Sequence, residues 1–255
     1  MRHHLLFIFI AILLFLKNNN AVAQQDPQFS QYFLNPFVYN PAYAGIENNL
    51  SATAHFRTQW LGIEGNPVIE NISIHSPVDI IHSGAGIQIL NEQVGALRNT
   101  AASLSYSYIL KTQFGKLSLG INGGVIQETL DGNKLRASEG DYTTGIDHND
   151  PLLSVVSVSG MAPDFSAGLF FKNNKISSGL SATHLIPMKL DLKDGGGNLE
   201  INFERQYYFQ FDYITPLSKS IEISPAVNVK SNGSLFQIEA DILLVYNKLI
   251  WIGGG

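Results

Sequence analysis

Histidine is the residue type in this sequence best suited to metal chemistry, and His75 with His82, and His148, are the best-placed candidates. Neither arrangement has the tight spacing of an HExxH helix. The segment 147–150 is acidic, but it lacks the spaced acidic ligands of an EF-hand calcium loop. We therefore expect no metal or other cofactor, and we interpret these histidines as loop residues or residues that line a wet interior.

Glycine and serine motifs also fail to predict catalysis. Ile89 stands where a dinucleotide fingerprint starting at Gly84 needs its third glycine. The glycines at 195–197 lack the Lys-Ser/Thr of a phosphate-binding loop, and no serine lies in a G-x-S-x-G elbow. We expect a protein that is not an enzyme.

One polar and aromatic cluster, formed by Arg57, Gln59 and Trp60, suits recognition better than catalysis. Arginine and tryptophan are common at the centres of protein interfaces. Tryptophan is equally common in the aromatic girdle of a membrane barrel, where Arg57 would face the lumen. The sequence leaves both interpretations open.

The composition excludes several classes of protein. The formal net charge is −5 and no run of Lys or Arg occurs, which argues against nucleic-acid binding. The absence of cysteine removes disulfides and thiolate chemistry. Charged residues make up only 15% of the chain, below the usual quarter or so of a soluble domain. This composition indicates that one face of the folded structure is apolar.

The elements expected from the sequence are β-strands. Apolar and polar residues alternate from about residue 50 to the end, as in 72–75, 117–122 and 236–242, and turn signals separate these segments. We predict roughly ten or eleven strands in an antiparallel meander. The polar positions are mostly Ser, Gln, Asn and Thr, as suits an enclosed wet lumen, whereas a soluble barrel would place Lys and Glu outside. The sequence therefore favours an all-β, up-and-down transmembrane β-barrel, with residues 131–150 as a long external loop.

The N-terminus is typical of an exported protein. Arg2 is followed by an apolar run from Leu5 to Leu16 and by the small-x-small pattern that ends at Ala23. The run is too short to cross a bilayer comfortably, so residues 1–23 are predicted to be a cleaved signal peptide.

The next segment, residues 24–46, differs from the strands. It contains two Asn-Pro steps, Asn35-Pro36 and Asn40-Pro41, and proline both removes an amide donor and disfavours helix in the preceding residue. It is also rich in Phe and Tyr, which need burial. We expect an extended or turning, plug-like segment that packs against or inside the barrel near its periplasmic mouth.

These motifs resemble a known family. The block from Asp26 to Gly45, with its D-P-Q-F-S-Q-Y opening and its N-P-A-Y-A-G end, and the later R-x-Q-W at Arg57, closely resemble the start of PorP/SprF proteins. Looser similarity continues through 167–185 and 221–255. The candidate partner-binding and family-motif residues are Gln28, Phe29, Ser30, Gln31, Asn35, Pro36, Asn40, Pro41, Ala42, Gly45, Arg57, Gln59 and Trp60.

The resemblance implies an outer-membrane barrel of the type IX secretion and gliding machinery of Bacteroidota. Besides outer-membrane lipid, the implied partners are a periplasmic, peptidoglycan-associated protein of the machinery and, for SprF-like members, a large secreted adhesin. A channel or carrier for small solutes is the alternative. Residues 47–255 are expected to form the barrel. Family members continue for several more strands, so the chain is interpreted as a fragment whose last strands are missing.

Overall fold

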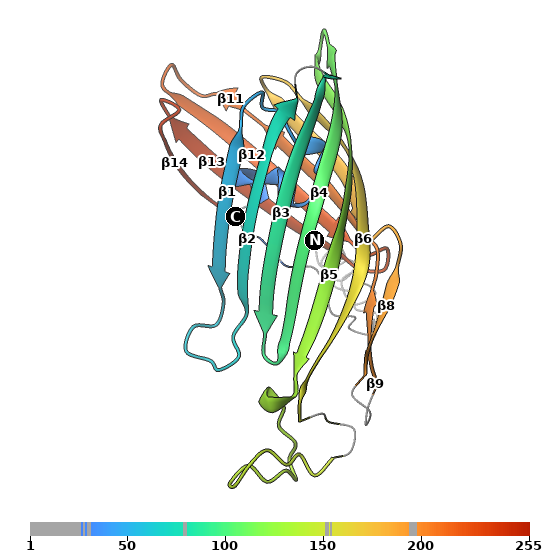
Figure 1. The fold of residues 1–255 in the computed structure, drawn as a ribbon. Coiled ribbons are helices and arrows are strands. Elements are labelled where there is room, and N and C mark those ends of the chain that lie inside the picture. Colours follow the sequence, from blue (N-terminus) through green and yellow to red (C-terminus); the bar gives the residue numbers. More distant parts are fainter. Residues whose placement is uncertain are drawn as a thin grey trace, which may run out of the picture.

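The computed structural model describes residues 27, 29, 32–78, 81–150, 153, 155–193 and 198–255 (Figure 1). The predicted signal peptide lies outside these residues. Short 3-10 turns come first: η1 (Tyr32–Leu34), η2 (Pro36–Val38) and η3 (Pro41–Tyr43), with η5 (Gly132–Lys134) later in the chain. No helix in the described part of the chain is long and apolar enough to span a membrane.

Strands make up most of the fold. Their bounds are β1 (Ser51–Thr58), β2 (Val68–Val78), β3 (Ser83–Val94), β4 (Leu97–Thr112), β5 (Gly115–Asp131), β6 (Ser157–Lys172), β7 (Ile176–Thr183), β8 (Met188–Lys193), β9 (Asn198–Phe203), β10 (Gln206–Tyr213), β11 (Thr215–Pro216), β12 (Ile221–Ser231), β13 (Phe236–Tyr246) and β14 (Ile250–Gly254).

One large antiparallel sheet contains all of these strands except β8 and β9. Its order is β1-β2-β3-β4-β5-β6-β7-β10-β12-β13-β14, with β11 paired to β12. Neighbours in sequence are neighbours in the sheet, so the predicted all-β, up-and-down meander is confirmed. Among the described residues the sheet does not close into a ring, because β1 and β14 are its two edges. The predicted barrel, which was expected without its last strands, is an open, curved sheet in this structure (Figure 1).

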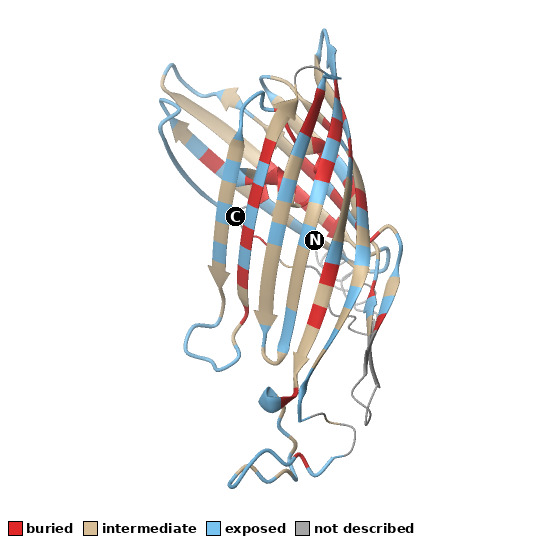
Figure 2. Cartoon of the chain, viewed as in Figure 1, coloured by how far each residue is buried: buried red, intermediate tan, exposed pale blue. Residues whose placement is uncertain are grey.

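The two faces of this sheet have the reverse of a soluble protein's polarity. On β2 the side chains of Asn71, Ser73 and His75 are buried, while the intervening Ile72 and Ile74 are 55% and 40% exposed. The same alternation of buried and exposed positions recurs along the strands (Figure 2). A polar inner face and an apolar outer face are the pattern of a sheet that stands in lipid.

The ends of the sheet differ in the length of their connections. At one end, called here the short-turn end, the connections 113–114, 173–175 and 247–249 are tight. At the other, the long-loop end, lie the segments 59–67 and 132–150 and the separate β8–β9 hairpin (Figure 1). Such asymmetry is typical of outer-membrane barrels.

The β8–β9 hairpin packs against the inner face near the long-loop end. Leu190 and Phe203 form an apolar cluster with Ile126 of β5, and Ala101 and Ala162 of the neighbouring strands pack against it. Ile126 has the same inward phase as Ser118 and Gly120. The hairpin thus covers one of the apolar parts of the inner wall.

Candidate functional site

The segment before β1 lies against the inner face of the sheet, and its described residues, 27, 29 and 32–47, are called the plug here. Both Asn-Pro steps open short 3-10 turns, η2 and η3, with proline at the first helical position. In Asn40 the side-chain Oδ1 accepts a hydrogen bond from the backbone N–H of Ala42 at 3.0 Å. This is the cap that Asn offers to a turn that proline can start. Between 32 and 43 the segment is turning rather than extended.

Asn40 also ties the plug to the sheet. Its Nδ2 donates to the carbonyl oxygens of Leu169 at 3.1 Å and Leu180 at 3.2 Å, which belong to β6 and β7. The residue is 1% exposed. One side chain therefore caps a turn of the plug and joins it to two neighbouring strands.

Further hydrogen bonds join the plug to the inner wall over several strands. Serine hydroxyls on the strands donate to plug carbonyls, a histidine nitrogen accepts from a plug amide, and a plug amide side chain donates to a serine. The bonds are Ser107 Oγ to Ala44 O at 2.7 Å, Ser181 Oγ to Tyr39 O at 2.7 Å, Gly45 N to His75 Nδ1 at 3.2 Å and Asn35 Nδ2 to Ser73 Oγ at 2.8 Å. Buried polar groups of plug and wall thus satisfy one another.

Glycines on the strands make room for the plug backbone. An added Cβ would lie 2.1 Å from the Ala44 carbonyl oxygen at Gly84, 2.2 Å from the Ala42 nitrogen at Gly120 and 2.1 Å from Asn40 Oδ1 at Gly168. These separations are far below any van der Waals contact. In the plug itself, Gly45 has φ +68, a conformation that glycine adopts without strain. Strand glycines permit another group to approach closely. Gly84 of β3 and Gly120 of β5 admit the plug backbone, and Gly168 of β6 admits the Asn40 side chain.

Aromatic side chains fill the space between the plug and the wall. Phe29, Tyr32 and Tyr39 form one buried cluster with Tyr208 of β10. The rings of Tyr39 and Tyr208 are 4.8 Å apart between centroids. Burial of rings this large contributes much of the favourable free energy of a packed interface.

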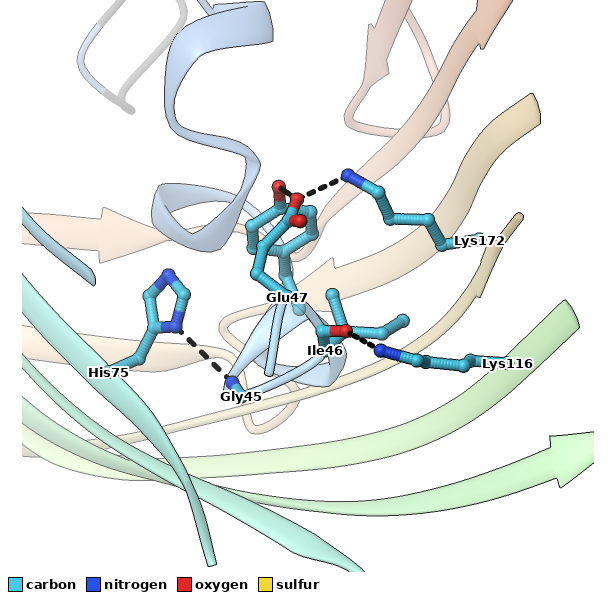
Figure 3. A network of polar contacts seen from close by, with 7 residues as sticks. Gly45, Ile46, Glu47, His75, Lys116 and Lys172 are labelled. Carbon is cyan, nitrogen blue, oxygen red and sulfur yellow. Dashed lines mark hydrogen bonds and ion pairs between the residues drawn. The ribbon is translucent and has the colours of Figure 1, made fainter. Parts of the chain in front are cut away.

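An ion pair fixes the end of the plug at the short-turn end of the sheet (Figure 3). The Glu47 carboxylate pairs with Lys172 of β6 and accepts a hydrogen bond from the Tyr43 hydroxyl. Lys116 of β5 donates to the carbonyl oxygen of Ile46 at 2.5 Å. Burial alone would raise the pKa of Glu47, but the bonds from Lys172 and Tyr43 lower it below its ordinary value.

Sequence reasoning missed these lysines and Glu47. In the sequence, Lys-Asn-Asn-Lys at 172–175 indicates only a turn, and nothing beside Lys116 indicates a role for that residue. Glu47, Lys116 and Lys172 are far apart in the sequence, so no local pattern indicates that they meet. The strand glycines were the available clue, since glycine inside a strand marks a close approach by another group.

The structure places the described residues of the predicted N-terminal motif against the inner face of the sheet. Phe29, Asn35, Pro36, Asn40, Pro41, Ala42 and Gly45 are all buried, whereas Gln28, Ser30 and Gln31 lie outside the described residues. The buried residues contact the protein's own wall, so they have structural roles in this chain.

The second predicted cluster lies at the opposite end. Arg57 is near the end of β1, and Gln59 and Trp60 begin the 59–67 connection at the long-loop end. Trp60 is 67% exposed and has φ +52. Arg57 lies opposite Ile69 of β2, which belongs to the same buried cluster as Phe29 and Tyr39 of the plug. Gln59 and Trp60 lie beyond the end of β1, in the 59–67 connection.

The candidate histidines have separate surroundings. His75 faces the plug, His82 is exposed, and His148 contacts the Tyr142 hydroxyl at 3.0 Å and the Gly132 carbonyl at 3.1 Å. In the described part of the chain, no group of three or more His, Cys, Asp or Glu side chains could hold a metal ion.

Comparison with known proteins agrees with the resemblance drawn from the sequence. Residues 21–255 match the family model described as "Type IX secretion system membrane protein PorP/SprF". No curated protein matches the chain. The family match covers both the plug and the whole sheet.

Proposed function

The chain belongs to the PorP/SprF family of type IX secretion system membrane proteins, and from this premise we propose that it is an outer-membrane barrel that works by protein-protein contact. Its contacts anchor the secretion machinery or support the export and attachment of a surface adhesin. The observation that carries this proposal is an inner wall occupied by the chain's own plug, which leaves the two ends of the sheet as the surfaces for partners.

Closure of the sheet into a barrel is part of the proposal. Lipid cannot satisfy the backbone groups of an unpaired strand edge, so β1 and β14 must find partners in the membrane. The apolar outer face and the polar inner face support this arrangement.

The proposed orientation places the short-turn end in the periplasm. Short turns face the periplasm and longer loops face outward in barrels of this kind. The end of the plug then lies at the periplasmic mouth, near a peptidoglycan-associated partner. The segments 59–67 and 132–150 face the exterior, where an adhesin would be met.

We also propose that the protein is not a catalyst. His75 accepts a hydrogen bond from the plug, His148 contacts a tyrosine and a backbone carbonyl, and His184 pairs with Asp164 at 2.9 Å. These contacts support a structural role for each of these three histidines.

A solute channel is the alternative function. A cavity of about 110 Å³ lies on the inner wall, and Phe29, Val38 and Tyr39 of the plug form part of its lining. The plug fills the neighbouring part of the inner face. This arrangement supports protein contact over free passage of solutes.

The test is a detergent pull-down of the full-length, tagged protein from its native outer membrane, followed by mass spectrometry. A variant that lacks residues 25–45 is treated in parallel. Recovery of a peptidoglycan-binding partner or a large adhesin, lost on deletion, supports the proposal. Recovery of the barrel alone, with conductance in planar bilayers, would favour the channel.

A further inference from the structure

Three lysines stand side by side across three neighbouring strands at the short-turn end. In the sheet register Lys111 of β4 lies opposite Lys116 of β5, and Lys116 lies opposite Lys172 of β6. Like charges directly opposite one another in antiparallel strands repel and destabilise the pair. The three adjacent lysines therefore repel one another, and the pairing of the strands alone does not explain why they lie together.

The row lies on the inner side of the sheet. Ser107 and Ile109, which share the phase of Lys111 along β4, are both buried, and Ser107 contacts the plug. Lys116 and Lys172 reach the plug directly (Figure 3). The lysines thus line the mouth of the curved sheet and do not project from its apolar outer face.

Negative charge near the row is scarce. Glu47 pairs with Lys172, while Lys116 donates to a backbone carbonyl. Asp212 also faces Lys172 from β10, but no ion pair joins these two residues. Lys111 is exposed and has no carboxylate partner among the described residues.

The turns beside the row add more positive charge. Among the described residues of the connections at this end, 81–82, 113–114, 173–175, 214–220 and 247–249, the charged residues are Lys175, Lys219 and Lys248. Asp79, in the same connection as 81–82, lies outside the described residues. Lys175 is exposed and follows Lys172 in the next turn. Lys248 lies 3.8 Å from Glu222 and is partly compensated. Lys175 thus adds exposed positive charge next to the row, and Lys219 and Lys248 add it farther along the same end of the sheet.

An apolar side chain lies next to the same row. Phe114 occupies the turn between Lys111 and Lys116 and is 72% exposed. Exposed aromatic residues surrounded by charge are typical anchors of protein interfaces.

From these observations we propose that the lysine row, Lys111, Lys116 and Lys172, together with Lys175 and Phe114, is the docking site for an acidic segment of a partner protein. This inference rests on the proposed function and names the chemistry of its periplasmic contact. Adjacent strands are about 4.8 Å apart, so the row spans about 10 Å. Two carboxylates at positions i and i+2 of an extended segment, about 7 Å apart, can reach this row. The inward phase of the lysines favours a protein segment at the mouth over lipid headgroups around the rim.

The test compares two charge-reversal variants of the full-length, tagged protein in its native outer membrane. K111E/K175E changes two exposed lysines that, unlike Lys116 and Lys172, form no hydrogen bond or ion pair with the described residues of the plug. R98E/K134E makes the same charge change at the long-loop end and is the matched control. A photo-reactive amino acid in place of Phe114 identifies the bound segment.

We expect K111E/K175E to lower recovery of the periplasmic partner about tenfold, and R98E/K134E to leave it unchanged. Partner binding by the unmodified protein should also weaken as salt is raised. The cross-link from position 114 should map to an acidic segment. Equal recovery with both variants would overturn the docking site but not the proposed function.

Two other outcomes separate the sources of failure. In the first, position 114 cross-links to lipid, and K111E/K175E weakens only the binding of vesicles that contain anionic phospholipid. The ligand of the row would then be lipid headgroups and not a protein segment, which would refute the inference. If the unmodified protein recovers no partner from the secretion system, the proposed function fails and the docking site with it.

Discussion

The plug should be loosened by the single substitution Asn40→Ala. This change removes the cap on Ala42 N and the two donations to the carbonyls of Leu169 and Leu180. A lost N-cap costs about 1 kcal/mol, and a lost buried hydrogen bond costs about the same. Because one amide group makes both donations, we count them as one hydrogen bond. The free energy that holds the plug against the sheet should then fall by about 2 kcal/mol.

The assay is hydrogen exchange of the folded protein in detergent, followed by mass spectrometry of peptides that cover residues 32–47. Local opening governs exchange in such a segment. Each 1.4 kcal/mol corresponds to a factor of ten, so protected amides of the plug should exchange about thirtyfold faster in Asn40→Ala.

Asn66→Ala is the matched control. The Asn66 side chain also makes two donations, to Thr58 Oγ1 at 2.7 Å and Gln59 O at 2.9 Å, but at the long-loop end. It should accelerate exchange in residues 59–67 and leave the plug unchanged. If plug exchange in Asn40→Ala stays within about threefold of the unmodified protein, the side chain of Asn40 does not hold the plug.

Three further predictions test the close approach of the plug to the sheet, the Glu47 ion pair and the assignment of the outer face to lipid. Gly120→Ala should expose the plug to protease, whereas Gly123→Ala, whose new Cβ meets its nearest atoms only at 3.6 Å, should not; equal cleavage would contradict the close approach. The Glu47 carboxylate has a lowered pKa, so its stabilising contribution is present above the ordinary value of 4.5 and is lost as pH falls through the lowered one. Acid should therefore lower the protection of the plug amides, measured as exchange relative to the intrinsic rate at each pH. Glu47→Gln should remove most of that pH dependence, and a protection that does not change with pH would argue against the tether. Leu104→Lys on the outer face should cost about 2 to 4 kcal/mol and lower the amount of assembled protein in the membrane, while Ser103→Lys on the inner face should be tolerated; the reverse order would refute the assignment of faces.

The sheet and its two faces could be predicted because the signal is local. In 72–75 the alternation of Ile with Ser and His already separates the faces, and the structure buries Ser73 and His75 while exposing both isoleucines. A period of two depends only on neighbouring residues. Closure is not encoded in alternation, because it depends on pairing between distant strands. The expectation that the last strands are missing came from the family resemblance, and the structure leaves β1 and β14 as the edges of the sheet.

The contacts of the plug were beyond local reasoning. The sequence shows Gly84 and Gly120 as glycines in strands, but not that Ala44 and Ala42 lie against them. Those pairs are far apart in sequence, and only the curvature of the sheet brings them together. Burial of the aromatic residues was foreseeable from their cost in water, but their positions were not.

The lysine row could be predicted from the sequence only in part. Lys111 and Lys116 flank one tight turn, so their pairing follows from the sequence once the turn is placed. Lys172 joins them only through the register of β5 with β6, whose connection contains the long segment 132–150. A loop of that length leaves the register open, so the third charge can be placed only by the folded sheet.

The plug is held differently in its two halves, and this bears on where a partner can bind. Hydrogen bonds to β2, β4, β5, β6 and β7 fix its later part, from Tyr39 to Ile46. The earlier part relies more on ring contacts, such as Phe29 with His55 at 5.0 Å and Phe33 with Trp251 at 6.0 Å. Directional bonds define a position more strictly than ring packing does. The lysine row adjoins the more strictly held half, so a partner that docks there meets a preorganised surface and binds without first displacing the plug.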